Sequence, residues 1–209
     1  MNPRATLFTL LLLLVVSTSL SAQRLLLGAE AGVGRSWEIE QLPLRALPTE
    51  AFGVSGGYGV SLSAVVGYEL GNLALSMHPG LIIQGTTAYV AAADDGGPDV
   101  RAGVQARGLL LPIYLSWRIG EQRRQPFVRA GGGLLIDLKP HQATPIPQLE
   151  PTQPFLELTV GLHLPAGRLR WSPALSLRNG TGEMFRSVDG TLHGQRWGYV
   201  ALGVTVTGR

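Results

Sequence analysis

Apolar side chains alternate with small or charged ones along most of the chain, and this period of two restricts the fold more than any other feature. In the stretch RLRWSPALSLRNG (168–180), the odd positions from 169 to 177 carry Leu, Trp, Pro, Leu and Leu, whereas the even positions from 168 to 178 carry Arg, Ser or Ala. Successive side chains of a β-strand point to opposite faces, so this stretch predicts a strand with one apolar face. Helical periodicity is almost absent, and the sequence therefore predicts an all-β protein.

Segments of this kind, each of about ten residues, follow one another without a change of composition that would mark a second domain. We expect eight strands, at residues 25–36, 57–70, 73–88, 106–119, 127–138, 155–164, 168–178 and 196–207.

The connections between these segments are alternately long and short. The short ones are GN, GEQRRQP and PAG, and the long ones contain EAFGVSGG, AAADDGGPDV, KPHQATPIPQLEPTQ and NGTGEMFRSVDGTLHG. In an up-and-down meander, this order places every short turn at one end and every long loop at the other. Such an arrangement is typical of a closed transmembrane β-barrel of the outer membrane.

The N-terminus has the pattern of a secretory signal peptide. Arg4 precedes the apolar run LFTLLLLLVV, and small residues lead to a cleavage point after Ser21 or Ala22. We therefore predict a cleaved signal peptide at residues 1–22 and a single barrel domain at residues 23–209. The chain contains no cysteine, which excludes a disulfide framework and thiolate chemistry in this exported protein.

Charged residues are too few to cover the surface of a soluble exported domain. They make up 15% of the chain, whereas a typical soluble domain has about 25%. Lys139 is the only lysine, the formal net charge is +3, and the arginines are scattered along the sequence. Nucleic-acid binding would need a clustered basic patch, so we expect no nucleic-acid partner.

The alternation by itself leaves two arrangements open. The aliphatic row fills the interior of a soluble lipocalin-like barrel, but it faces lipid in a membrane barrel. The opposite row is rich in Gly, Ala, Ser and Thr, which suits the narrow lumen of an eight-stranded barrel. Tyr68, Trp117 and Trp171 lie in the aliphatic row near the short turns, as in an aromatic girdle, and Trp37 and Tyr89 are candidates for the opposite girdle. We therefore predict that the aliphatic row faces lipid.

This orientation places charged side chains inside a barrel that is too narrow for an open channel. Buried charges need partners, so we predict two layers of paired charges that close the lumen. The layer near the short turns contains Glu30, Glu69, Arg118, Arg129 and Arg170. The layer near the long loops contains Arg107, Asp137, Glu157 and Arg178. A gated or selective pore is the alternative use of these charges.

The sequence lacks the phosphate-binding, dinucleotide, zinc-protease and serine-hydrolase motifs. We therefore expect no enzyme activity, no cofactor and no metal. One alternative is a lipid-modifying enzyme, because Ser76 and His78 share one face of a strand and Glu69 lies across the turn. The other alternative is a secreted soluble barrel that carries an apolar ligand.

Several stretches together resemble the PorT-type outer-membrane β-barrel family. They are LGAEAGVG, GYGVSLSAVVGYEL, LLLPIYLSWRIGEQRRQPFVRAGGGLLIDL and LELTVGLHL, and the resemblance covers nearly all of residues 23–209. It implies an eight-stranded antiparallel up-and-down barrel in the bacterial outer membrane. We expect both chain termini in the periplasm, contacts with outer-membrane lipids and lipopolysaccharide, and a structural or interaction role. Long extracellular loops would contact an envelope protein partner.

Overall fold

Antiparallel β-strands dominate the computed structural model of the protein. It describes residues 24–38, 51–91, 100–120, 123–138, 148–149, 151–181, 185–186, 192–193 and 197–208. The predicted signal peptide at residues 1–22 lies outside this part of the chain. Among the described residues, no helix is long and apolar enough to cross a membrane.

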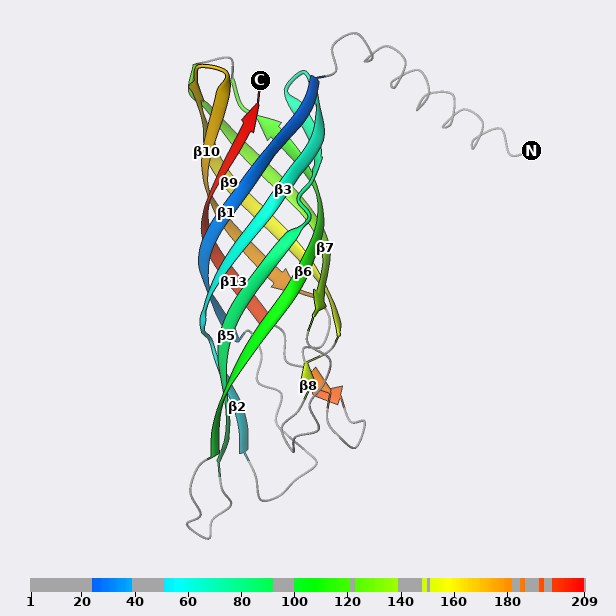
Figure 1. Cartoon of the computed structure of the whole chain (residues 1–209), viewed down its shortest axis with the longest axis vertical. Helices are drawn as coiled ribbons and strands as arrows, with labels where there is room; N and C mark the ends of the chain where they lie inside the picture. Colours follow the sequence, from blue (N-terminus) through cyan, green and yellow to red (C-terminus); the bar gives the residue numbers. More distant parts are fainter. Residues whose placement is uncertain are drawn as a thin grey trace, which may run out of the picture.

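One large sheet closes on itself to form a barrel (Figure 1). Strand β1 pairs antiparallel with β13 on one side and with β3 on the other, which closes the sheet. The bounds of the strands in this sheet are β1 (Arg24–Glu38), β2 (Ala51–Ser55), β3 (Tyr58–Leu70), β4 (Leu73–Met77), β5 (Gly80–Ala91), β6 (Val100–Arg118), β7 (Gln125–Asp137), β9 (Thr152–Ala166), β10 (Leu169–Gly180) and β13 (Trp197–Gly208).

Two of the barrel strands are interrupted, so the ten segments make an eight-stranded barrel. Strands β2 and β3 are separated at residues 56–57, and β4 and β5 at residues 78–79. Pro79 has no N–H to donate to the ladder, although its carbonyl accepts a bond of 2.9 Å from the Ala64 amide. The register is the same on both sides of this second gap, since Met77 pairs with Val66 and Gly80 pairs with Ser63. The predicted closed, antiparallel, eight-stranded barrel is therefore confirmed.

Three tight connections lie together at one end of the barrel, between β3 and β4, β6 and β7, and β9 and β10. Each contains a glycine with positive φ, namely Gly71 at 60°, Gly120 at 78° and Gly167 at 63°. Side chains with a Cβ adopt this conformation at a cost, so glycine is favoured at these positions. Arg24 at the start of β1 and Gly208 at the end of β13 lie at the same short-turn end (Figure 1).

Strands also extend past the barrel at the opposite, long-loop end. There β2 pairs with β5, and β5 with β6, as far as residues 91 and 100 (Figure 1). A second sheet at this end joins β8 (Gln148–Leu149), β11 (Phe185–Arg186) and β12 (Leu192–His193). It therefore connects two of the predicted long loops through backbone pairing.

Exposure alternates along the strands, and the aliphatic row is on the outside. On β9, the side chain of Leu158 is 50% exposed whereas Thr159 is fully buried. The exposed large apolar residues on the barrel strands include Leu25, Leu27, Val33, Val60, Leu62, Val66, Leu75, Leu81, Ile83, Ile113, Leu115, Leu156, Leu158, Val160, Leu175, Leu177, Leu202 and Val204. A soluble barrel would place this row inside, so the arrangement is that of a membrane barrel.

Replacing Leu158 by Arg tests this orientation, because Leu158 lies near the middle of β9 on the outer face. In a bilayer we expect a loss of about 2–4 kcal/mol in the free energy of unfolding, measured by urea titration in liposomes. Leu169→Arg at the short-turn end of β10 is the matched control, with an expected loss of about 0–1 kcal/mol. Equal losses at the two depths would contradict a lipid-facing exterior.

Candidate functional site

The lumen is filled by inward-facing side chains in three layers. We call them, in order from the short turns to the long loops, the short-turn cluster (Glu69, Arg118, Arg170), the central network (Glu30, His78, Tyr114, Arg129, Glu157, Arg178) and the apolar plug (Ile82, Leu110, Leu135, Phe155, Trp197, Tyr199).

Glu30 on β1 is the first anchor of the central network. Arg129 on β7 donates to both of its carboxylate oxygens, over 2.7 Å from Nη1 and 3.3 Å from Nη2. The Thr205 hydroxyl on β13 donates to Glu30 Oε2 over 2.7 Å, and His78 Nδ1 lies 3.1 Å from the same oxygen. Four strands or strand ends therefore meet at one carboxylate.

Glu157 on β9 is the second anchor. Arg178 on β10 binds it through Nε at 2.8 Å and Nη2 at 2.6 Å, and the Tyr114 hydroxyl donates to it over 2.8 Å. Arg129 Nη2 lies 3.7 Å from Glu157 Oε1, so this arginine contacts both glutamates. The result is an alternating chain of two carboxylates and two guanidinium groups across the barrel, in which the formal charges cancel.

Aromatic rings support the two arginines of the central network. The guanidinium of Arg129 lies 4.5 Å from the centroid of the Tyr114 ring. That of Arg178 lies 4.7 Å from the Phe155 ring and 5.6 Å from the Tyr199 ring. Planar guanidinium groups stack favourably on aromatic faces, which helps to hold these charges in a narrow lumen.

The short-turn cluster is centred on Glu69 of β3. Its carboxylate lies 2.5 Å from Arg170 Nη2 and 3.5 Å from Arg118 Nη1. Arg170 Nε also donates to the Thr207 hydroxyl over 3.3 Å, and Arg118 donates to the carbonyl of Gly71 in the β3–β4 turn. One carboxylate thus serves two guanidinium groups at this end.

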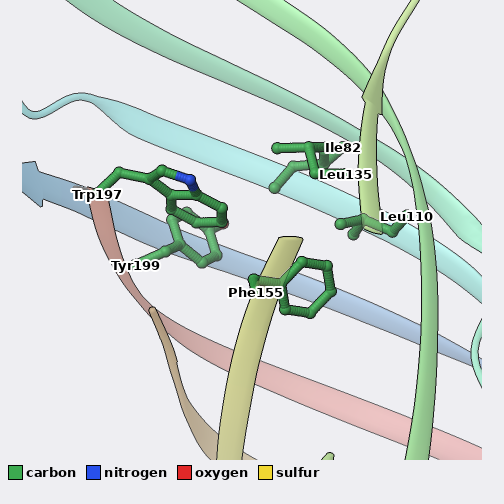
Figure 2. Close-up of a cluster of buried hydrophobic side chains, with 6 residues drawn as sticks. All are labelled: Ile82, Leu110, Leu135, Phe155, Trp197 and Tyr199. Atoms are coloured by element: carbon green, nitrogen blue, oxygen red, sulfur yellow. The ribbon is translucent and has the colours of Figure 1, made fainter. Parts of the chain in front are cut away.

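The apolar plug closes the lumen toward the long loops. Figure 2 shows its six side chains, which come from β5, β6, β7, β9 and β13. The rings of Phe155 and Trp197 are tilted, with their centroids 6.4 Å apart. Sequence reasoning predicted a layer of charges in this half of the lumen, and the structure has apolar packing between the central network and the loops.

The structure groups the predicted charges differently from the sequence. Glu30 and Arg129 were placed in one layer and Glu157 and Arg178 in another, but all four belong to the central network. Asp137 lies on the inward row at the long-loop end of β7, where it is half-buried.

The placement of Arg107 in the lumen is wrong. Inward residues of β6 have even numbers, and Leu110 and Tyr114 are buried there, whereas the side chain of Arg107 is exposed on the outward row. The alternation of β6 continues without a bulge to this residue, since Arg107 pairs with Ile83 in the regular register with β5. Neighbouring residues of a strand face opposite sides, so Arg107, at an odd-numbered position, faces outward.

The three girdle residues, Tyr68, Trp117 and Trp171, are all exposed on the outer face near the short turns. Trp37 and Tyr58 are exposed on the outer face near the long-loop end. Sequence reasoning proposed Trp37 for this second girdle and missed Tyr58. The side chain of Tyr89, the other candidate, lies outside the described part of the chain.

Ser76 and His78 are hydrogen-bonded in the lumen, with Ser76 Oγ 3.0 Å from His78 Nε2. The carboxylate that contacts His78 is Glu30 from β1, and Glu69 belongs to the short-turn cluster. Ser76 and His78 are each 3% exposed, and the adjoining cavity of about 40 Å³ has room for a few water molecules. Both side chains of this pair are therefore enclosed within the lumen.

Crystal structures of two small outer-membrane proteins are similar in fold. Neisserial surface protein A aligns with a TM-score of 0.50 and 12% identity, over 88% of this chain and 97% of that one. The outer membrane protein OprG from Pseudomonas aeruginosa aligns with a TM-score of 0.53 and 10% identity, over 88% of this chain and 94% of that one. No family model and no curated protein matches the sequence. The chain has the fold of a small outer-membrane β-barrel.

The central network makes a strong prediction about Glu157. Glu157→Gln leaves Arg178 without its buried counter-charge, so we expect a loss of about 3–5 kcal/mol in the free energy of unfolding. The double variant with Arg178→Met removes both charges and should recover part of this loss, as measured by urea titration in liposomes.

Glu69→Gln is the matched control for Glu157→Gln, because it makes the same change in the short-turn cluster. The Glu69 side chain is 14% exposed and that of Glu157 is 1% exposed, so water screens the charges of the short-turn cluster better. We expect a smaller loss for Glu69→Gln. A double variant that is less stable than Glu157→Gln alone would contradict the pairing of Glu157 with Arg178.

Proposed function

We propose that the protein is a non-conducting barrel of the bacterial outer membrane that presents its long loops to the cell exterior. In this role the barrel is a rigid base, and the loops contact lipopolysaccharide and a protein of the envelope. The observation that carries the proposal is the filled lumen. A barrel without a passage cannot transport solutes, so the surfaces left for binding partners are the loops and turns at its two ends. Membership of the PorT-type family belongs to the same proposal and rests on the sequence stretches quoted above.

The exterior supports the membrane location. Aliphatic side chains cover the outer face of the barrel strands, and exposed Trp or Tyr residues lie near both ends of this apolar belt. Side chains of Trp and Tyr favour the headgroup level of a bilayer. Lipids of the outer membrane are therefore the partners that the outer face fits.

The long-loop end supports an interaction role. Strands β2, β5 and β6 extend past the barrel, and the sheet of β8, β11 and β12 joins two loop segments. This backbone pairing gives the segments that project at the long-loop end regular structure (Figure 1). Connections at the other end are tight glycine turns, which offer little surface to a partner.

A role as an enzyme finds no support in the lumen. Ser76 is enclosed, and the described residues contain no group of three His, Asp or Glu side chains that could hold a metal ion. We therefore propose a role without catalysis and without a cofactor.

Conductance tests the filled lumen directly. In planar bilayers we expect the purified protein to give no conductance steps, because both the central network and the apolar plug close the barrel. Leu110→Ala opens a space in the plug and removes no contact described for the central network, so this variant should be silent as well. Regular steps from the unaltered protein would support a selective pore and overturn the proposal.

Cross-linking on intact bacterial cells tests the orientation and the role of the loops. A photo-cross-linking amino acid in place of Asp95, in a long link, should give adducts with lipopolysaccharide or with one envelope protein. The matched control is the same replacement at Arg123, in the short β6–β7 turn, where we expect no such adducts. Adducts with lipopolysaccharide from position 123 alone would reverse the proposed orientation.

A further inference from the structure

The short-turn half of the lumen contains a small polar cavity. Its volume is about 40 Å³, and it lies between the central network and the short-turn cluster. Arg118, Arg129 and Arg170 line it together with Glu69, two histidines and several Ser and Thr hydroxyl groups. A space of this size admits a few water molecules or a small ion, but it excludes lipids, sugars and phosphate esters.

Positive charge exceeds negative charge around this cavity. Arg129 is neutralised by the bidentate contact with Glu30. Arg118 and Arg170 share the single carboxylate of Glu69. A buried or half-buried guanidinium without a counter-charge costs free energy, so the excess favours the uptake of one negative charge.

The groups around the cavity also supply more donors than acceptors. Among the described residues, the Nε groups of Arg118 and Arg129 are buried without a hydrogen-bond partner. The hydroxyl of Thr207 on the wall accepts a hydrogen bond from Arg170 Nε, so its own proton, like that of Ser116, can be donated to an anion. The acidic group on the wall, Glu69, is already engaged by two arginines.

The cavity is close to the short-turn rim. Arg118 contacts the Gly71 carbonyl in the β3–β4 turn, and 17% of its side-chain surface is accessible. An ion therefore needs to pass only the short-turn cluster to enter, whereas the central network and the apolar plug close the way from the long loops.

We propose that this cavity is a binding site for one small monovalent inorganic anion, of which chloride is the natural probe. Arg118 and Arg170 supply the charge, and the Ser and Thr hydroxyls complete the coordination. Bound anion neutralises the short-turn cluster and holds β3, β6 and β10 together at this end. The site goes beyond the proposed function, because it concerns the barrel and makes no use of the loops.

Thermal unfolding of the purified full-length barrel in detergent micelles tests the site. Sodium chloride or bromide, exchanged for sodium gluconate at constant sodium concentration, should raise the unfolding midpoint by a few degrees in a saturable manner. Gluconate is too large for the cavity, so the comparison separates site binding from ionic strength. Broadening of the chloride-35 NMR signal should saturate over the same concentration range.

Charge variants assign the effect to this cavity. Arg170→Gln removes the excess charge and should abolish both the halide shift and the NMR broadening. Arg168→Gln makes the same change two residues away on the exposed β9–β10 turn, and it should leave both signals unchanged. Glu69→Gln adds to the excess and should produce saturation at lower halide concentration.

Two results would overturn the site. Equal midpoints in chloride, bromide and gluconate for the unaltered barrel would show that the cavity holds water only. A halide shift that survives Arg170→Gln unchanged would place the effect elsewhere on the protein. Neither result depends on cross-linking or conductance, so the anion site and the proposed function can fail separately.

Discussion

Backbone hydrogen bonding in hydrocarbon is the constraint on which the rest of this structure depends. Lipid offers no partner to an N–H or C=O group, so a sheet that crosses a membrane has to close on itself. The pairing of β1 with both β13 and β3 achieves this closure. Closure at eight strands fixes a narrow lumen, and a narrow lumen has to be filled by side chains. The exterior is then left to aliphatic residues, and charge is confined to the inside and the ends.

Within this limited space, the lumen combines two kinds of packing. In the charged part, Arg129 contacts both Glu30 and Glu157, and Arg178 forms a second ion pair with Glu157. Phe155 and Tyr199 then form the boundary between charge and apolar packing, because they stack under Arg178 and also belong to the apolar plug. The ion-paired and apolar layers are therefore one continuous filling.

Much of the fold is predictable from the sequence because alternation depends on strand geometry alone. The row that holds Leu158, Val160 and Leu162 could be assigned to the outside from the Gly, Ala, Ser and Thr content of the opposite row. The charge partners could not be assigned in the same way. Contacts such as Glu30 with Arg129, 99 residues apart, depend on the stagger of the strands around the barrel, which alternation does not encode.

The apolar plug could have been predicted from the sequence, although the alternating pattern drew attention away from the relevant residues. The runs GLII and GLLL, at residues 80–83 and 108–111, are apolar at consecutive positions, so both faces of these strands are apolar there. Ile82 and Leu110 are the inward members of these runs. The wrong prediction for Arg107 has a different cause, because the alternation was not followed there. Counting from the inward residues Leu110 and Tyr114 places the side chain of Arg107 outside.

The hydrogen bonds of Glu30 have a consequence for how the barrel is assembled. Its partners include Thr205 in the last strand, 175 residues away, and Arg129 near the middle of the chain. A partly built sheet that lacks β1 leaves Arg129 without its closest carboxylate, and one that lacks β13 leaves Glu30 without the hydroxyl of Thr205. When β1 and β13 join, they therefore form stabilising contacts in the lumen as well as the backbone hydrogen bonds between them. Contacts so distant in sequence carry a high loop-closure entropy, so we expect this barrel to fold slowly.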